Sequence, residues 1–495
     1  MSEQQQHEGR TTHLQRGVLF TSVGAGVNIV FLMMEAIIAA RLVSTSNYGI
    51  YTLLVALVNF LVVAVDFGCK TAAAQMLASS PRDRQAVIVA NTLLFRLAVI
   101  LVVSVLIWLL EQPLIAFDST PGLVLYIGYL PFMLVVTSLD ELLFGILQGF
   151  HCYRQIAIAM VMRSVLRLGL TVVLLAGFDL GVLALVYSWT ISFAASSLYQ
   201  YLVLPTGRRL GYQRALLVEM LRFGFPLQMA RVLWFAFRRV DVLLLGTFAG
   251  PASVAFYAVA SRIPDALQRM ADSYTTVYFP TMTALLKSDQ HGQARWVFNR
   301  SLRLVSFAAA LMALGGVVFN RQIVLLLFSE RYLPSAPVFA VLMLAFHMTL
   351  VVSLLGYTLT AAGFPGRSLT ENTVRTTLNI IGDLVLIPLY GFMGPAAASL
   401  VTAYIGNPVV VWLLRRTGHA VEVRPYAIQS GTLLLCAWLF WLVQGGMLFG
   451  STILVIFVVL NILLSTITWE DLYLVLPERM RGQPAVVQET PTHGS

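Results

Sequence analysis

Fourteen apolar runs, each long enough to cross a lipid bilayer, constrain this 495-residue chain more than any other feature. A spanning helix needs about 20 consecutive apolar residues. The chain is 58% hydrophobic and 11% charged, whereas soluble domains carry about 25% charged residues. We therefore predict an all-α polytopic membrane protein. The runs lie near residues 18–40, 48–78, 86–110, 121–150, 155–178, 181–204, 224–248, 252–285, 297–319, 335–362, 368–390, 394–414, 425–445 and 448–468.

Basic residues between the runs predict the orientation of the chain. Seventeen lie in the two tails and in every second loop, and three, Arg41, Arg321 and Arg331, lie in the remaining loops. Positive charge accumulates on the cytoplasmic side of membrane proteins. This asymmetry predicts a multi-pass protein of the cytoplasmic (inner) membrane with both termini in the cytoplasm. The same asymmetry explains the net charge of +9 by basic cytoplasmic loops, so this charge does not indicate nucleic-acid binding.

The loops are too short to hold a soluble catalytic domain, so we expect a non-enzymatic protein that works through its helices. The three cysteines, Cys69, Cys152 and Cys436, show no metal-binding or redox spacing. We therefore expect no metal site and no cofactor.

A weak internal repeat predicts two similar halves. An offset of 206 residues places the stretch 44–68 over 250–274, so that Tyr51 meets Tyr257 and Asp66 meets Asp272. Parallel halves around a midplane cavity are a transporter architecture. The expected division is a cytoplasmic tail at 1–17, a first six-helix lobe at 18–204, a linker at 205–223, a second lobe at 224–414, two extra helices at 415–476 and a cytoplasmic tail at 477–495.

Charged residues inside the runs are the best candidates for function, because a charge facing lipid at midplane costs about 2.5–3.5 kcal/mol or more. Arginine concentrates in the runs 155–178 and 224–248, and its planar guanidinium suits phosphate oxygens. We predict that these arginines bind an anionic, phosphate-bearing head group. The alternative is that they only pair with interior carboxylates of the second half, namely Asp241, Asp265, Asp272 and Asp383. The predicted ligands are Arg231, Arg238, Arg239, Arg163, Arg167 and Arg375.

A second group of charges forms a stripe in the run 252–285. Arg262, Asp265, Arg269 and Asp272 are spaced by three, four and three residues, which places them on one helix face with alternating sign. We expect the stripe to neutralise itself through i,i+3 and i,i+4 pairs and to form a cavity wall that positions the lobes. Asn59 belongs to the matching stripe of the first half.

Several motifs resemble those of polysaccharide biosynthesis exporters, the Wzx-type flippases of the MOP (MATE-like) superfamily. They are Ala40-Arg41-Leu42, the Tyr48-Gly49-x-Tyr51 run, Asp66-Phe67-Gly68 and the segment LQGFHCYR at 147–154. The Gly-Pro usual before the first Tyr-Gly is replaced by Ser44-Thr45-Ser46, while the second half keeps Gly250-Pro251. The resemblance covers nearly the whole chain.

This resemblance implies that the chain flips a polyprenyl-pyrophosphate-linked oligosaccharide across the membrane for surface polysaccharide synthesis. The lobes would rock about a central cavity, where Gln228, Trp234 and Tyr257 would contact sugars. Asp66, Asp241 and Glu35 are candidates for binding a coupling ion, H⁺ or Na⁺, or else are arginine partners. A glycan polymerase or glycosyltransferase is an expected partner.

Two rival functions remain. A MATE-like multidrug exporter would share the lobes, but an arginine-rich cavity would repel its cationic substrates. A membrane glycan polymerase or ligase would need a large extracytoplasmic loop, and no such loop is evident in the sequence.

Overall fold

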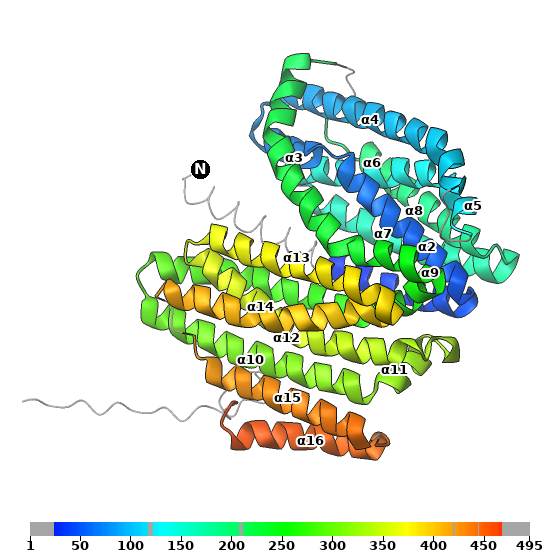
Figure 1. Cartoon of the computed structure of the whole chain (residues 1–495). Coiled ribbons are helices and arrows are strands. Elements are labelled where there is room, and N and C mark those ends of the chain that lie inside the picture. Colours follow the sequence, from blue (N-terminus) through cyan, green and yellow to red (C-terminus); the bar gives the residue numbers. More distant parts are fainter. Residues whose placement is uncertain (1–23, 117–121, 207–210, 419–420, 444, 468–495) are drawn as a thin grey trace, which may run out of the picture. The chain divides into compact units, whose positions relative to one another are not determined.

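A computed structural model describes the chain except for residues 1–23, 117–121, 207–210, 419–420, 444 and 468–495 (Figure 1). The tails expected at 1–17 and 477–495 therefore lie outside the described residues. Within the described part every regular element is a helix. Each of the fourteen predicted runs coincides with one or two helices, so the predicted fold class is confirmed.

The first described helix is Gly24–Leu42. The others are α2 (Thr45–Ala64), α3 (Cys69–Ser79), α4 (Arg82–Ala116), α5 (Val124–Ile127), α6 (Leu130–Gly149), α7 (Tyr153–Phe178), α8 (Val182–Leu202), α9 (Arg214–Lys287), α10 (His291–Val318), α11 (Asn320–Leu327), η1 (Glu330–Tyr332), α12 (Ser335–Ala361), α13 (Pro365–Tyr390), η2 (Gly391–Met393), α14 (Gly394–Arg416), α15 (Val423–Val443) and α16 (Met447–Leu463).

Eleven stretches of the described residues are long and apolar enough to cross a membrane, and α16 is a shorter apolar helix. The eleven are fewer than the fourteen predicted runs for three reasons. Pro365–Arg416 contains two runs, the run 448–468 corresponds to the shorter α16, and only Val240–Lys287 of α9 is among the eleven stretches. Pro365–Arg416 joins α13 and α14, which the short η2 separates. The helix α9 contains two predicted runs, and Gly250, with φ 78°, interrupts it between them. Positive φ is accessible to glycine at little cost because it lacks a Cβ atom.

Large apolar side chains on the helix surfaces agree with a lipid environment. Leu448 is 88% exposed, Leu125 is 77% exposed and Trp441 is 73% exposed. A water-soluble protein rarely exposes so much contiguous apolar area. The chain is therefore described below as a multi-pass membrane protein.

The described chain divides into two compact units. Unit 1 holds the residues up to Leu267 together with Arg321–Leu342 and Val374–Thr402, and unit 2 holds Gln268–Asn320, Met343–Thr373 and the residues from Ala403 onwards. This border cuts through α9, so it does not follow the borders expected for the two lobes. The lobes stay a prediction, and each unit is considered by itself.

Glycines allow close approach of segments within unit 1. A Cβ atom on Gly49 of α2 would lie 1.8 Å from the carbonyl oxygen of Pro251 in α9. Gly68, with φ 77°, separates α2 from α3, and a Cβ there would lie 2.1 Å from the carbonyl oxygen of Gly224. The Tyr-Gly motif of the first half thus packs against the Gly-Pro motif of the second.

Candidate substrate-binding site

The first charged cluster in unit 1 is centred on Glu35, which lies in the helix Gly24–Leu42. Arg167 of α7 donates to both carboxylate oxygens of Glu35 at 3.1 Å and to the hydroxyl of Tyr51 at 2.7 Å. Arg167 is 8% exposed and Glu35 is 4% exposed. Nearby, Arg262 of α9 donates to the hydroxyl of Tyr48 at 3.2 Å. We call these five residues the Glu35 cluster.

Aromatic rings on α8 support the two arginines of α7. The guanidinium of Arg167 lies 4.3 Å from the ring centre of Trp189, and that of Arg163 lies 4.6 Å from the ring centre of Phe193. The two rings stack with their centres 4.7 Å apart. Arg163 and Arg167 are one turn apart, as are Trp189 and Phe193, so the two helices match each cation to a ring.

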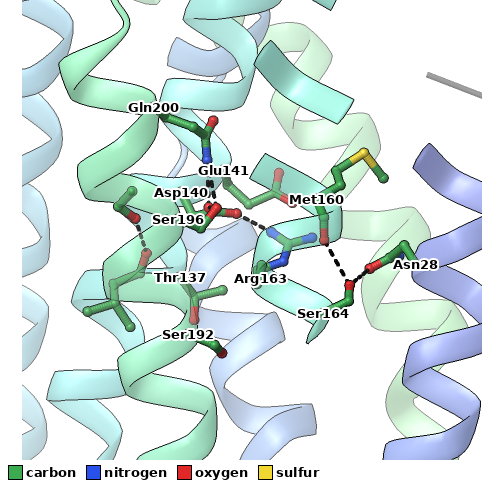
Figure 2. A network of polar contacts seen from close by, with 12 residues as sticks. Asn28, Thr137, Asp140, Glu141, Met160, Arg163, Ser164, Ser192, Ser196 and Gln200 are labelled. Atoms are coloured by element: carbon green, nitrogen blue, oxygen red, sulfur yellow. Dashed lines mark hydrogen bonds and ion pairs between the residues drawn. The ribbon is translucent and has the colours of Figure 1, made fainter. Parts of the chain in front are cut away.

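A second cluster surrounds Asp140 of α6 (Figure 2). Arg163 forms an ion pair with its Oδ2. Its Oδ1 accepts from the hydroxyl of Ser196 at 2.5 Å and from the amide of Gln200 at 2.6 Å. Asp140 is 2% exposed, so its charge is held by three donors from α7 and α8. Such a fully hydrogen-bonded carboxylate fixes the geometry of the helices that supply its donors.

A third cluster surrounds Asp66, at the end of α2. Arg96 of α4, 1% exposed, forms an ion pair with Oδ1, and Arg231 of α9 lies 3.5 Å from Oδ2. The side chain of Arg231 is 43% exposed. A neighbouring pair joins Lys70 to Glu141, whose side chain is 42% exposed.

The third cluster is not electrically neutral. Asp66 faces two arginines, Arg96 and Arg231, whereas Lys70 is matched by Glu141. This cluster therefore carries an excess of about one positive charge among its described side chains. In the Glu35 cluster, Arg262 also interacts with Asp265, so its two arginines face two carboxylates. The excess around Asp66 is best exposed at Arg231. This is the position where an anionic ligand could meet a cation without first displacing a buried ion pair.

The predicted ligands consequently differ in their surroundings. Arg167 is buried against Glu35, Arg163 is held by Asp140, and Arg231 is partly exposed. The expected alternative of pairing with carboxylates holds for all three, although the partners are Glu35, Asp140 and Asp66 rather than acids of the second half. Arg375 is half-buried on α13. The side chains of Arg238, Arg239 and Trp234 lie outside the described residues.

The self-pairing of the stripe on α9 stays a prediction. Among the described side chains, Arg262 interacts electrostatically with Asp265 without an ion pair within 4.0 Å, and its guanidinium donates to the hydroxyl of Tyr48 on α2. Asp272 is exposed and accepts from Gln268 at 3.1 Å. Arg269 is exposed, and Asn59 is half-buried on α2. The role of the stripe as a cavity wall stays a prediction.

Asp241 of α9 has different surroundings from Glu35 and Asp66. The hydroxyl of Tyr257 donates to its Oδ2 at 2.8 Å, and Asp383 of α13 lies close enough to interact with it electrostatically. Asp383 is 2% exposed, and its Oδ1 has no hydrogen-bond partner among the described residues. One turn earlier on α13, Asn379 contacts the hydroxyl of Thr402 at 3.5 Å. Two acids and a tyrosine thus share one site.

The repeat relates this site to the Glu35 cluster. The offset of 206 residues that aligns Tyr51 with Tyr257 also aligns Glu35 with Asp241. In the first half a tyrosine, an acid and an arginine meet. In the second half a tyrosine and two acids meet. The halves therefore reuse one tyrosine–acid arrangement with opposite charge beside it.

Sequence reasoning missed Ser196 and Gln200, which bind Asp140. Together with Ser188 and Ser192 they recur every four residues on α8, and this polar stripe in an apolar run was a usable signal. The sugar contacts of Gln228 and Tyr257 stay a prediction, and in this structure both side chains have partners within the protein. Gln228 is 1% exposed and donates to the carbonyl of Val63, and Tyr257 donates to Asp241.

The family of the chain follows from its sequence. A family model described as polysaccharide biosynthesis protein matches residues 38–337, a stretch that contains Asp66, Arg96, Asp140, Arg167 and Arg231. The chain belongs to the polysaccharide biosynthesis protein family. The resemblance noted from the motifs is therefore confirmed, and the charged clusters are mostly inside the matched part.

Two relatives of this polysaccharide biosynthesis protein come from Haloferax volcanii. "Probable flippase AglR" is 26% identical over 229 residues, which cover 45% of this chain and 44% of AglR. This match thus spans less than half of AglR. "Probable low-salt glycan biosynthesis flippase Agl15" is 20% identical over 426 residues, which cover 84% of this chain and 85% of Agl15.

Solved structures share the fold of this family member. The lipid II flippase MurJ, in an inward closed conformation, aligns with a TM-score of 0.71 at 14% identity over 92% of this chain and 99% of MurJ. A multidrug resistance MATE family transporter of the MOP superfamily, in an inward-facing conformation, aligns with a TM-score of 0.64 at 16% identity over 81% of this chain and 98% of that transporter. At these identities the alignments establish the fold alone.

Proposed function

We propose that this polysaccharide biosynthesis protein flips a polyprenyl-pyrophosphate-linked oligosaccharide from the cytoplasmic to the outer face of the cytoplasmic membrane. The observation that carries the proposal is Arg231, a partly exposed arginine that shares Asp66 with the buried Arg96. A pyrophosphate brings the negative charge that this site lacks, and a guanidinium matches its oxygens. The flippase names of AglR and Agl15 support the same substrate class.

Transport proceeds by alternating access, in which two lobes rock about the bound head group. The protein makes and breaks no covalent bond in this cycle, so it acts as a transporter and not as an enzyme. Differential binding in the two states moves the substrate. The buried pairs Arg167–Glu35 and Arg163–Asp140 hold their helices in register, while Arg231 contacts the pyrophosphate. Arg238, Arg239 and Arg375 are further candidates for this contact.

A coupled cation binds beside Asp241. Two neighbouring carboxylates inside a membrane repel each other strongly when both are charged. Such a pair is stabilised when one carboxylate takes up a proton or when both bind a metal ion. Asp241, Asp383 and the hydroxyl of Tyr257 supply the oxygen atoms that H⁺ or Na⁺ would use. Asp66 and Glu35 are arginine partners and are not proposed for this role.

A MATE-like multidrug antiporter is the second candidate, because it has the same fold. The net positive charge near Arg231 disfavours it, since cationic drugs would be repelled. A glycan polymerase or glycosyltransferase is proposed as a partner that consumes or supplies the lipid-linked glycan.

Deletion of the gene in its own organism tests the proposal. We expect lipid-linked oligosaccharide to accumulate on the inner leaflet, where impermeant glycan-binding probes reach it only after the cells are opened. Complementation with Arg231→Lys should restore part of the surface glycan, and Arg231→Ala should restore at least about tenfold less than wild type. Normal surface glycan together with drug sensitivity in the deletion strain would instead favour the antiporter.

A further inference from the structure

Unit 2 contains a pocket that lies outside the charged clusters described above. Its volume is ≈ 370 Å³, and it lies between the first turns of α10 and the segment that leads into α15. The side chains that line it are Arg295, Trp296, Asn299, Arg300, Arg303 and Glu422. Among the described side chains of the lining, three are arginines and one is a carboxylate.

Half of these lining residues lie on one face of α10. Arg295, Asn299 and Arg303 follow one another every four residues on α10 and therefore project from the same side. The guanidinium of Arg300 lies 4.8 Å from the ring centre of Trp296. Trp296 is 58% exposed. Tryptophan and arginine together near a helix end are typical of the membrane interface.

The segment before α15 borders the pocket, and α15 itself is joined to α10. The buried amide of Gln429 on α15 donates to the carbonyl of Arg303 and, also at 3.3 Å, to the carbonyl of Thr466 beyond α16. The backbone N–H of Glu422 donates to Oδ1 of Asn299 at 3.1 Å. The Nδ2 atom of Asn299 is buried and has no hydrogen-bond partner among the described residues. The pocket thus contains one buried N–H donor without a hydrogen-bond partner among the described residues.

We propose that this pocket binds the phosphate group of an anionic membrane lipid on the cytoplasmic side. Arg295, which is exposed, supplies charge and N–H donors for phosphate oxygens beside the buried Nδ2 atom of Asn299, and the exposed Trp296 is of a residue type enriched at the level of the head groups. The basic residues of this loop are on the side that the charge asymmetry assigns to the cytoplasm. The site is separate from Arg231 and Asp66, and it does not depend on which substrate the protein carries.

Native mass spectrometry of the full-length protein in detergent, titrated with phosphatidylglycerol, tests the proposal. Arg295 is exposed, so Arg295→Ala should fold normally and weaken phosphatidylglycerol binding about fivefold. Arg300→Ala should add a similar loss. Arg416→Ala is the matched control, because Arg416 also lies over a tryptophan, Trp412, at 3.9 Å but outside the pocket.

Other results of the lipid titration would overturn or support the proposal as follows. Equal binding of phosphatidylglycerol by wild type, Arg295→Ala and Arg416→Ala would overturn the proposal. Displacement of the lipid by inorganic pyrophosphate at equal concentration would also overturn it, because the ligand would then be a soluble anion. Tighter binding of a polyprenyl phosphate, with the same loss in Arg295→Ala, would support a lipid-phosphate site and identify its lipid. Transport of the oligosaccharide is measured separately, so the two proposals can fail independently.

Discussion

Arginines inside this membrane protein are matched to carboxylates that lie far away in sequence. Arg167 pairs with Glu35 across 132 positions, and Arg96 pairs with Asp66 across 30 positions. Removing one partner of such a pair leaves a buried charge, which costs about 3–5 kcal/mol. The pairs are therefore requirements for folding as well as candidates for function.

A stability experiment separates these roles. Glu35→Gln should lower the melting temperature of the detergent-solubilised protein strongly, because Arg167 would keep its charge without a counter-ion. The double change Glu35→Gln with Arg167→Met should recover much of the loss. Arg84→Met with Glu219→Gln is the control, since this pair is exposed on both sides and contributes little. If Glu35→Gln were as stable as wild type, the pair would not be structural.

The coupling proposal also belongs to the residue scale. Asp241→Asn and Asp383→Asn should each abolish the acceleration of transport by an imposed Na⁺ or pH gradient in proteoliposomes, because each removes a carboxylate from the cation site. Glu219→Gln, a change at an exposed ion pair, should leave that acceleration unchanged. An unchanged response in both aspartate variants would exclude this site.

At the residue scale, the sequence showed which charged side chains lie inside apolar runs, but not which residues they contact. Arg163 and Arg167 stood out because no acid is near them along the chain, and their partners Asp140 and Glu35 lie on other helices. Only the tertiary structure brings those helices together. The correspondence between Glu35 and Asp241 was visible in the sequence. The offset of 206 residues aligns these two acids when it is extended to the helix before the aligned stretch.

At the scale of single elements, breaks in the helices follow glycine. Gly68 and Gly250 have positive φ; Gly68 directly precedes α3, and Gly250 interrupts α9. The apolar runs predicted the helices well because hydrophobic length is set by the bilayer. They could not predict that α2 and α3 are separate helices, because that feature depends on backbone contacts. The runs 224–248 and 252–285 do match the two helical parts of α9 on either side of Gly250.

The contact between α2 and α9 predicts the effect of a small substitution. Gly49→Ala should sharply reduce the yield of folded protein, because the new Cβ would overlap the carbonyl of Pro251. Gly169→Ala on α7 should be tolerated or slightly stabilising, since nothing lies within 4 Å of its Cβ position. Size-exclusion profiles of the two variants from equal cultures measure this. Equal profiles would show that α2 and α9 do not approach as described.

At the scale of the whole molecule, alternating loops predict a defined topology. In a variant without Cys69, Cys152 and Cys436, an impermeant maleimide should label Glu330→Cys in intact cells and Asp289→Cys only after permeabilisation. Both positions are exposed in the structure. Labelling of Asp289→Cys in intact cells would contradict the fourteen-helix orientation and with it the cytoplasmic placement of the lipid-phosphate pocket.

Measured flipping of the substrate tests the central claim most directly. Lipid-linked oligosaccharide purified from the deletion strain would be incorporated into proteoliposomes, and its exposure to an impermeant glycan-modifying enzyme would be followed over time. We predict that wild-type protein makes the inner-leaflet pool accessible and that Arg231→Ala slows this by at least about tenfold, while Arg416→Ala does not. An inner pool that stays protected in the presence of folded wild-type protein would contradict the account.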